Sequence, residues 1–279
     1  MRQRTTSRMV VGAVVGALIL GGLGGPAGAQ SRPSIIDKIQ KEGVLRVCVA
    51  IATPWMMKDP KGSDFVGFDV DMVGEFTKAL QVKPELVAVP AFGQLIASLQ
   101  SGKCDVIMTA LTRTLQRAVA VAFSEPYFYL GSAWVVKKDR KDLNTLADLN
   151  KPTITVAVEQ GALSEQRTRK NLPNAKVKAL PGGGDALRLT EVESGRSDAA
   201  GTDSIKVPIY AEQFKWARFI PADAFDHPVD RAGIAYAARR DDLDLINLLN
   251  VFIEQMRNTG KLDEFTRKWV TPEHIRLQQ

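Results

Sequence analysis

The sequence predicts an α/β protein made of two similar lobes, and three observations indicate this architecture. Strand and helix patterns alternate in each half of the chain, an order typical of parallel sheets covered by helices. Ser101-Gly102 and Ser194-Gly195 stand at corresponding places in the two halves. The last helical segment, residues 243–269, has no sheet pattern of its own to cover. We therefore expect two sheets of mainly parallel strands, each flanked by helices.

Residues 1–29 have the pattern of a secretory signal peptide. Arginines near the start are followed by an uncharged apolar run over residues 9–23 and then by Ala27-Gly28-Ala29. An uncleaved membrane anchor is the alternative, but the glycines between residues 12 and 25 weaken such a span. We expect cleavage after Ala29 and export to the periplasm, without a lipid anchor because no cysteine follows the cut.

The composition is that of a folded globular protein and gives little support for nucleic-acid binding. The chain has 279 residues, of which 45% are hydrophobic and 24% charged. Its net charge of +6 includes Arg2, Arg4 and Arg8, and falls to +3 when they leave with the signal peptide. The basic cluster within residues 137–141 lacks the interleaved aromatic residues of a single-strand groove. We expect a solvated linker there and no nucleic-acid partner.

The first lobe begins with a short helix signal and continues with strands and helices in alternation. The valine-rich apolar run over residues 44–51 is typical of a strand buried on both faces. The expected elements are helices at 35–40, 69–80 and 93–100 and strands at 44–51, 85–89 and 106–111.

The second lobe repeats this order. Its expected elements are strands at 153–158, 176–180 and 198–201 and helices at 163–170 and 185–193. In each lobe a glycine, Gly102 or Gly195, lies where a helix ends and the chain turns back into the sheet. The match at corresponding positions supports a second lobe of the same build.

The C-terminal segment should pack back on the first lobe, which would make that lobe discontinuous in sequence. Asn258-Thr259-Gly260 divides the segment into two helices. The apolar residues at helical spacing are Leu245, Leu248, Leu249, Phe252, Ile253 and Met256. We expect residues 34–131 and 229–279 in the first lobe, residues 132–228 in the second, and two crossing strands near 132–137 and 228–237.

Cys48 and Cys104 are the only cysteines. Each lies in or beside an expected strand of the first lobe. The exported location permits a disulfide between them, and two separate buried thiols are the simpler expectation. The sequence leaves both alternatives open.

Ligands of open parallel α/β sheets bind beyond the carboxyl ends of the strands. In the first lobe these positions are residues 52–55, Phe92 and residues 110–117. In the second lobe they are residues 159–164 and 202–203. Two such lobes facing each other would form one cleft, with a cation on one side and an anion on the other. The pattern predicts a site for a small charged solute.

Four motifs in this order resemble the polar amino acid family of bacterial solute-binding proteins. They lie at residues 66–71 (Val-Gly-Phe-Asp-Val-Asp), 95–102, 112–117 (Thr-Arg-Thr-Leu-Gln-Arg) and 123–127 (Phe-Ser-Glu-Pro-Tyr). The resemblance extends roughly over residues 43–269. It implies the two-lobed periplasmic-binding-protein fold of type II. It also implies a periplasmic receptor that captures an amino acid or a similar small charged solute by cleft closure and delivers it to the permease of an ABC importer.

The resemblance implies roles for three residues of this chain. Arg117 matches the arginine that grips the ligand α-carboxylate with a planar pair of donors. Asp203 matches the aspartate that takes the α-ammonium, and Phe92 matches the aromatic residue that covers the ligand side chain. Without the resemblance, we would expect either charge on the surface or in a structural ion pair.

Three further residues are expected at the site on the same basis. Thr112 would offer its hydroxyl, and Ala110 its main chain, to the ligand carboxylate. Trp55 lies in the loop after the first strand, where other aromatic residues of the family contribute. Packing in the core is an equal alternative for this large apolar ring.

The second lobe departs from the family pattern. Members for polar amino acids often carry an acidic residue near Ala50 and threonines where this chain has Ala162 and Leu163. Gly161 is kept, so main-chain N–H groups at that helix start are expected to bind an anion. These differences favour a less polar ligand or one that lies differently in the cleft. Glu159 is a candidate partner for a basic ligand side chain, with an exposed glutamate as the simpler expectation.

We expect a receptor and no enzyme, with no catalytic residues, metal or cofactor. His227 and His274 are the only histidines and cannot make a multi-histidine metal site. A secreted cyclohexadienyl dehydratase is an enzymatic alternative on the same fold, with Glu159 or Glu165 as its general acid. A ligand-presenting adaptor for a sensor is another alternative. The expected partners are a small-molecule ligand and the permease subunits, and the receptor is expected to be a monomer.

Overall fold

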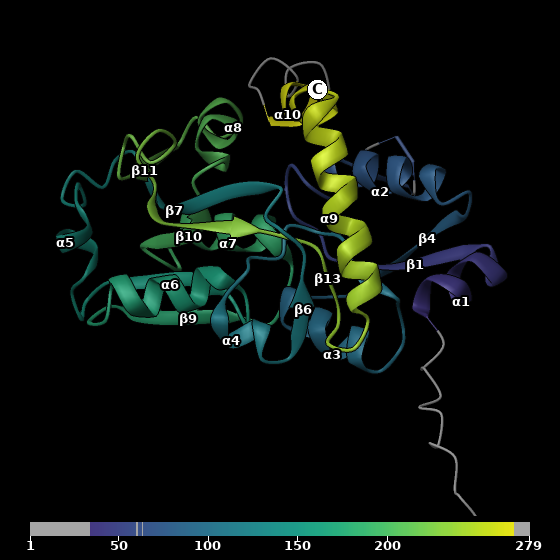
Figure 1. Ribbon diagram of the computed structural model, residues 1–279. Helices are drawn as coiled ribbons and strands as arrows, with labels where there is room; N and C mark the ends of the chain where they lie inside the picture. The colour runs from purple at the N-terminus through teal and green to yellow at the C-terminus, as the bar shows by residue number, and fades with distance from the viewer. Residues whose placement is uncertain (1–33, 60, 63, 271–279) are drawn as a thin grey trace, which may run out of the picture. The chain divides into compact units, whose positions relative to one another are not determined.

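The computed structural model describes residues 34–59, 61–62 and 64–270. The predicted signal peptide, residues 1–29, lies outside the described residues. Within them, none of the helices combines the length and the apolar character that a membrane span requires. The described chain forms two large sheets with helices packed on them, so the predicted α/β fold with two lobes is confirmed (Figure 1).

The first sheet has five strands in the order β4-β1-β5-β13-β6. β4, β1 and β5 are parallel, and β13 runs antiparallel to both β5 and β6. The strands are β1 (Val44–Val49), β4 (Lys83–Ala88), β5 (Val106–Ile107), β6 (Val121–Phe123) and β13 (Ala237–Arg239), and a separate hairpin comprises β2 (Met57–Lys58) and β3 (Phe65–Val66).

The second sheet repeats the parallel core of the first. β9, β8 and β10 are parallel, and β7 runs antiparallel to β10, β11 and β12. The strands are β7 (Phe128–Lys137), β8 (Thr155–Glu159), β9 (Lys176–Leu180), β10 (Ala199–Asp203), β11 (Ala217–Ile220) and β12 (Val229–Ile234). Each lobe therefore has three parallel strands bordered by an antiparallel strand.

Two antiparallel strands connect the sheets. β7 follows β6 of the first sheet and enters the second, and β12 pairs with β7 and leads back to β13 of the first. The crossing segments expected from the sequence overlap these strands. Where one lobe ends and the other begins along them stays a prediction.

Helices cover both sheets, and the last two lie with the first lobe (Figure 1). Leu245, Phe252 and Ile253 of α9 and Phe265 of α10 are buried in the first-lobe core beside residues of β1 and α2. First-lobe helices are α1 (Ile35–Glu42), α2 (Phe68–Ala79), the 3-10 turn η1 (Phe92–Gln94), α3 (Leu95–Gln100), α4 (Leu115–Ala118), α9 (Leu243–Asn258) and α10 (Lys261–Val270). Second-lobe helices are α5 (Leu146–Leu149), α6 (Leu163–Asn171), α7 (Gly184–Glu193) and α8 (Lys206–Gln213).

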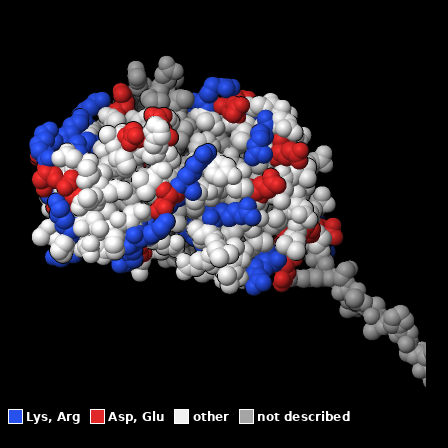
Figure 2. Space-filling model, turned by 60° about the vertical axis from the view of Figure 1, so that its left-hand side comes forward, with Lys and Arg blue, Asp and Glu red and all other residues white. Residues whose placement is uncertain are grey.

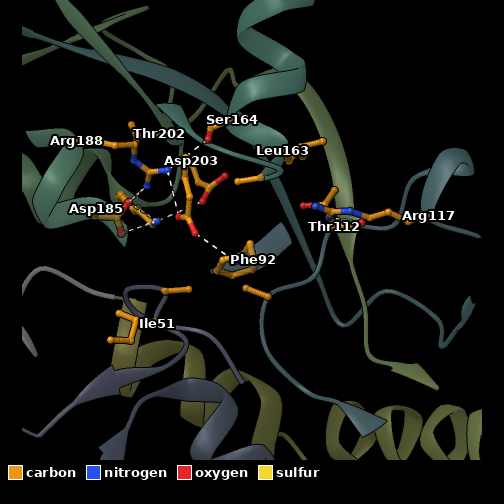
Figure 3. Close-up of a pocket in the computed structure, with 15 residues that line it drawn as sticks. Ile51, Phe92, Thr112, Arg117, Leu163, Ser164, Asp185, Arg188, Thr202 and Asp203 are labelled. Carbon is orange, nitrogen blue, oxygen red and sulfur yellow. Dashed lines mark hydrogen bonds and ion pairs between the residues drawn. The ribbon is translucent and has the colours of Figure 1, made fainter. Parts of the chain in front are cut away.

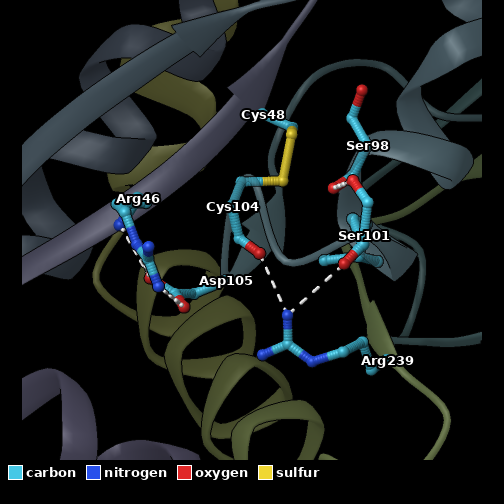
Figure 4. Close-up of a disulfide and its surroundings, with 8 residues drawn as sticks. Arg46, Cys48, Ser98, Ser101, Cys104, Asp105 and Arg239 are labelled. Carbon is cyan, nitrogen blue, oxygen red and sulfur yellow. Dashed lines mark hydrogen bonds and ion pairs between the residues drawn. A yellow bond between two sulfur atoms is a disulfide. The ribbon is translucent and has the colours of Figure 1, made fainter.

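Cys48 and Cys104 form a disulfide in the core of the first lobe (Figure 4). The disulfide joins β1 to the turn that leads into β5. Arg239 of β13 donates to the carbonyl oxygen of Cys104 over 3.0 Å, and Arg46 lies 2.8 Å from the carboxylate of Asp105. Of the two alternatives that the sequence leaves open, the structure has the disulfide.

β5 is shorter than the strand expected at residues 106–111, because the chain after Ile107 bonds to other segments. The Thr109 hydroxyl donates to the carbonyl oxygen of Ala50 over 3.1 Å, and the Ala110 N–H donates to the Asp69 carboxylate over 2.9 Å. The chain thus leaves the sheet at the carboxyl end of β5 and reaches the region between the lobes at Ala110.

Candidate functional site

Residues from both lobes line one small cavity at the carboxyl ends of the strands (Figure 3). Its volume is about 50 Å³, so the two lobes lie close together around it. Predicted site residues that line it are Phe92, Ala110, Thr112, Arg117, Glu159, Ala162 and Asp203. The other lining residues are Ile51, Ala52, Leu163, Ser164, Asp185, Arg188, Thr202 and Lys206.

Arg117 is a buried cation that has no acidic partner among the residues that the structure describes. Its N–H donates to the Thr114 hydroxyl at the start of α4, and the residue is 8% exposed. Its Nη1 donates to the carbonyl oxygen of Thr112 over 3.0 Å, and its Nη2 to that of Gly161 in the other lobe over 3.4 Å. Burial, and secondarily the charge of Arg167, lowers the pKa of Arg117 to about 10. The guanidinium is therefore charged at pH 7 and bonded only to neutral acceptors.

Asp69 fixes the loop that carries Ala110 and Thr112. Its fully buried carboxylate accepts hydrogen bonds from the Ala110 N–H and from the hydroxyls of Tyr127 and Tyr236, over 2.9, 3.1 and 3.0 Å. Tyr127 precedes β7 and Tyr236 follows β12, so one carboxylate joins the loop to both crossing segments. Burial raises the pKa of Asp69 to about 6, although the three hydrogen bonds oppose the shift. Asp69 therefore already uses the Ala110 N–H that was expected to face the ligand.

The second lobe contributes five charged side chains that alternate in sign: Glu159, Arg188, Asp185, Lys206 and Asp203 (Figure 3). Arg188 Nη1 lies 3.7 Å from Glu159 Oε2, and Arg188 also pairs with Asp185. Lys206 Nζ lies 2.8 Å from Asp185 Oδ2 and 3.3 Å from Asp203 Oδ2. Burial alone would raise the pKa of Asp185, but Lys206 and Arg188 outweigh it and hold that pKa below its usual range. We call these five residues the charge network.

Close contacts join the two lobes beside the cavity. The Phe92 N–H donates to Glu159 Oε1 over 3.1 Å. Glu159 is 4% exposed, so the simpler expectation of an exposed glutamate is wrong. A Cβ atom built on Gly161 would lie 2.9 Å from the Cα atom of Gly93, which shows how closely the two backbones approach. A side chain at Gly161, which also has a φ of +75°, would require one of the two backbones to shift.

Two predicted site residues do not line the cavity. Trp55 is fully buried in the first-lobe core, with its ring edge-on to those of Phe68 and Phe128 at centroid distances of 5.1 and 5.2 Å. Burying so large a ring contributes more free energy than a place at a polar cleft, which explains its position. The Gly161 N–H donates to Glu165 Oε2 over 2.9 Å, so one of the main-chain N–H groups expected to bind an anion is already used by a side chain of α6.

Asp185, Arg188 and Lys206 line the cavity but are absent from the sequence prediction. Asp185 follows β9 as residues 159–164 follow β8, so the rule on strand ends applies to it equally. Arg188 and Lys206 each stand three residues after an acidic residue with which they pair. Asp185 and Arg188 lie on one helix, where side chains at this spacing meet, whereas Asp203 ends β10 and Lys206 begins α8. Both signals are present in the sequence.

The chain matches the family of bacterial extracellular solute-binding proteins, family 3, over residues 45–272. It belongs to this family. The family resemblance, the type II two-lobed fold and the function in solute binding that the sequence predicts are thereby confirmed. The family description also places this solute-binding protein among extracellular proteins.

Individual relatives of this solute-binding protein include receptors and one enzyme. The lysine/arginine/ornithine-binding periplasmic protein of Escherichia coli is 30% identical over 77% of this chain and 83% of its own length. The cyclohexadienyl dehydratase of Pseudomonas aeruginosa is 28% identical over 77% of this chain and 79% of its own. The crystal structure of the ancestral amino acid-binding protein AncCDT-1, a precursor of cyclohexadienyl dehydratase, is 35% identical with a TM-score of 0.77, over 85% of this chain and all of its own.

The surface of this solute-binding protein carries charges of both signs. On the face that Figure 2 shows, basic and acidic side chains are interspersed with uncharged ones. Within residues 34–59, 61–62 and 64–270, no cluster of His, Cys, Asp or Glu is arranged to hold a metal ion. The groups that line the described cavity include ion-pairing and hydrogen-bonding side chains that can contact a ligand.

Proposed function

We propose that this protein is a monomeric periplasmic receptor that captures an amino acid and delivers it to the permease of an ABC importer. In this proposal Arg117 binds the ligand α-carboxylate and Asp203 the α-ammonium. Phe92 covers the ligand side chain. Export by the signal peptide at residues 1–29 is part of the same proposal.

The observation that carries the proposal is the isolated charge of Arg117. A buried guanidinium bonded only to carbonyl oxygens has lost its hydration without gaining a counterion. A carboxylate entering the cavity would supply that counterion in the bidentate geometry that arginine prefers. The Thr202 hydroxyl supports the proposal further, because it lines the cavity, is buried and has no hydrogen-bond partner in the part of the chain that the structure describes.

Asp203 is the member of the charge network best placed to meet an ammonium group. Its side chain is 29% exposed, whereas those of the other four members are at most 12% exposed. It also stands at one end of the network, where Lys206 is its ion-pair partner and Arg167 and Arg188 interact with it electrostatically. Part of its charge therefore remains available to a ligand.

A binding role, and not catalysis, is favoured by the state of the carboxylates. A dehydratase needs a carboxylic acid that can donate a proton. Glu159 bonds to the Phe92 N–H and lies beside Arg188, and Asp185 is held ionised by two cations. Burial would raise the pKa of Glu165, but hydrogen bonds from Gly161 and Arg169 lower it. With their pKa values lowered, neither Asp185 nor Glu165 resembles a proton donor.

We further propose that β7 and β12 form the hinge, with the lobes comprising residues 34–131 with 229–279 and residues 132–228. Ligand would enter while the lobes are apart and stabilise the closed form through its contacts with both of them. A ligand can shift this equilibrium only by its differential affinity for the closed form. Contacts with Asp203 would therefore drive closure, and the permease would recognise the closed form.

Isothermal titration calorimetry with a panel of amino acids would test the proposal. Arg117→Ala should weaken binding about 100-fold or more, because a charge pair with the ligand is lost. Arg113→Ala is the matched control, since Arg113 is exposed on the same loop and does not line the cavity. Asp203→Asn should weaken amino acids more than the corresponding acids without an amino group. Unchanged affinity in Arg117→Ala would contradict the proposal.

The enzymatic alternative has a separate test, motivated by the dehydratase relative. Purified protein would be incubated with prephenate or arogenate and the mixture analysed by mass spectrometry. A receptor leaves these compounds unchanged beyond their spontaneous decay. Turnover that Glu159→Gln abolishes would establish the dehydratase instead.

A further inference from the structure

The charge network contains its own counterions for most of its acidic charge. Arg188 lies between Glu159 and Asp185, and Lys206 lies between Asp185 and Asp203. The side chains of Arg188 and Lys206 are only 7% and 4% exposed. Cations this deeply buried are fixed parts of the site, because their charges are supported by carboxylates and not by water.

Both cations keep their charge in this environment. Burial would lower the pKa of Lys206, but the charges of Asp185 and Asp203 outweigh it and raise that pKa. Burial would likewise lower the pKa of Arg188, but the charges of its acidic neighbours, Asp185 foremost, outweigh burial and raise that pKa. The network therefore consists of three negative and two positive groups and has a net charge of −1.

The first-lobe side of the cavity has the opposite net charge. Arg117 is the ionised residue that the first lobe contributes to the lining, so the lining as a whole is neutral. Arg167 is also near, but it does not line the cavity; it donates to the carbonyl oxygens of Leu130 and Asp230 and is stabilised by the charges of Asp203 and Asp230. A zwitterion matches this arrangement, with its carboxylate at the cation and its ammonium at the network.

A larger cavity adjoins the charged one and shares Ile51 and Glu159 with it. Its volume is about 360 Å³, and most of its lining is apolar, including Val89, Pro90 and Ala91. Lys58 also lines it, and its ammonium group is already engaged over the Phe65 ring, 3.8 Å from the ring centroid. Glu159 offers no free charge there, because the Phe92 N–H and Arg188 already contact its two oxygens. Within the described residues, each charged side chain that lines this space therefore already has a partner.

We propose that Arg188 and Lys206 act as built-in counterions that exclude charged side chains, so that the ligand is an amino acid with an uncharged side chain. This inference rests on the proposed function. A cationic side chain would find each network acid beside a cation already in place, and an acidic one would add to the net negative charge. Either would carry an uncompensated charge into a desolvated site. The selectivity of this protein for amino acid side chains would thus differ from that of the relative named for lysine, arginine and ornithine.

Pairs of amino acids that differ only in side-chain charge provide the test. Norleucine has the carbon chain of lysine without its ammonium group, and glutamine is the neutral counterpart of glutamate. In calorimetry the wild type should bind each neutral member at least about tenfold more tightly than its charged partner, the ratio expected for one unpaired charge.

Lys206→Met tests the counterion directly. The methionine fills a similar volume but leaves Asp185 and Asp203 with one cation fewer, so the ratio of lysine to norleucine affinity should rise at least about tenfold. Lys206→Arg keeps the charge and should keep the wild-type ratio. Lys151→Met is the matched control, because Lys151 is 52% exposed, pairs with Asp148 on α5 and does not line the cavity.

The outcomes separate this inference from the proposed function. If no amino acid binds, the proposed function fails. If amino acids bind but lysine equals or exceeds norleucine in the wild type, the inference is wrong while the receptor assignment stands. This comparison needs no variant, so it remains decisive even if Lys206→Met does not fold. A ratio unchanged in a folded Lys206→Met protein would also overturn the counterion role.

Discussion

The two lobes hold their halves of the cavity in different ways. In the first lobe Arg117 is bonded to the main-chain carbonyl of Thr112 and, across the cavity, to that of Gly161 in the second lobe. The adjoining first-lobe loop is fixed by Asp69 and its two tyrosine partners. A disulfide braces the same sheet. In the second lobe the charged side chains hold one another through ion pairs, and no disulfide is present among the described residues of that lobe.

This difference suggests a division of work between the lobes. A cation fixed by the backbone presents the same geometry to any carboxylate, so the first lobe would bind the group that all amino acids share. A network of side chains can change its charge by substitution without altering the backbone, so the second lobe would decide which ligand is accepted. The first lobe should accordingly depend on covalent and buried hydrogen-bonded supports, and the second on electrostatics.

The largest effect should come from the disulfide. Replacing Cys48 and Cys104 with serine should lower the free energy of unfolding by about 4 kcal/mol, since the bond closes a loop of 56 residues. Urea unfolding would measure the loss, and hydrogen exchange would locate it. Exchange should accelerate in β1 and β5 and remain unchanged in β8 and β9.

Reducing agent supplies the control for this comparison. It should lower the stability of the wild type toward that of the double serine variant and leave the variant unaffected. Equal acceleration of exchange in both lobes would show that the disulfide does not brace the first lobe selectively.

Asp69 should make the first lobe less stable as pH rises. Its pKa is about 6 in the folded protein and 3.8 for an ordinary aspartate, so the folded state holds the proton more tightly than the unfolded chain. Stability is therefore lost as pH increases from about 4 through 6, by about 3 kcal/mol. Asp69→Asn mimics the protonated form, so the wild type should lose this amount relative to the variant in urea unfolding at pH 4 and pH 7.

Asp185 offers the matched second-lobe comparison, with the opposite sign. Its pKa is lower in the folded protein than in the unfolded chain, so its contribution is present above about pH 4 and is lost as pH falls below the ordinary value. The difference between the wild type and Asp185→Asn should consequently decrease on acidification. If the stability difference between wild type and variant changed with pH in the same direction for both aspartates, the proposed electrostatic difference between the lobes would be wrong.

The pattern of the sequence was sufficient to predict the two sheets, the packing of α9 on the first lobe and the positions of Arg117 and Asp203 at one cavity. The period of the apolar residues and the order of strands and helices determine such features, because a parallel sheet brings the carboxyl ends of its strands to one edge. The same rule would have found Asp185 had it been applied to the end of β9.

Other features depend on contacts between distant residues and could not be read from the pattern. Trp55 lies in the core because Phe68 and Phe128 form a pocket for it, and neither neighbour is adjacent in sequence. The Ala110 N–H is unavailable to a ligand because Asp69 reaches it from α2. Buried donors and acceptors must be satisfied, but the sequence does not say by which partner.

The smallest effect should come from the contact between the lobes. A Cβ atom on Gly93 would lie 3.3 Å from the carbonyl oxygen of Gln160 and 3.5 Å from the Cα atom of Gly161, both in the second lobe. Gly93→Ala should therefore disfavour the closed form and weaken ligand binding about threefold to tenfold, the range typical of mild overpacking. Because the added methyl group meets the other lobe and not its own, the thermal stability of the free protein should change little.

Gly74→Ala is the control for this last comparison, since Gly74 lies in α2 with no atom within 4 Å of an added Cβ. It should leave affinity unchanged. Calorimetry would give the affinities, and small-angle X-ray scattering with saturating ligand would report closure through the radius of gyration. If Gly93→Ala binds and compacts like Gly74→Ala, the Gly93 contact with the second lobe does not control closure, and the coupling between the lobes must come from Arg117 and Glu159 instead.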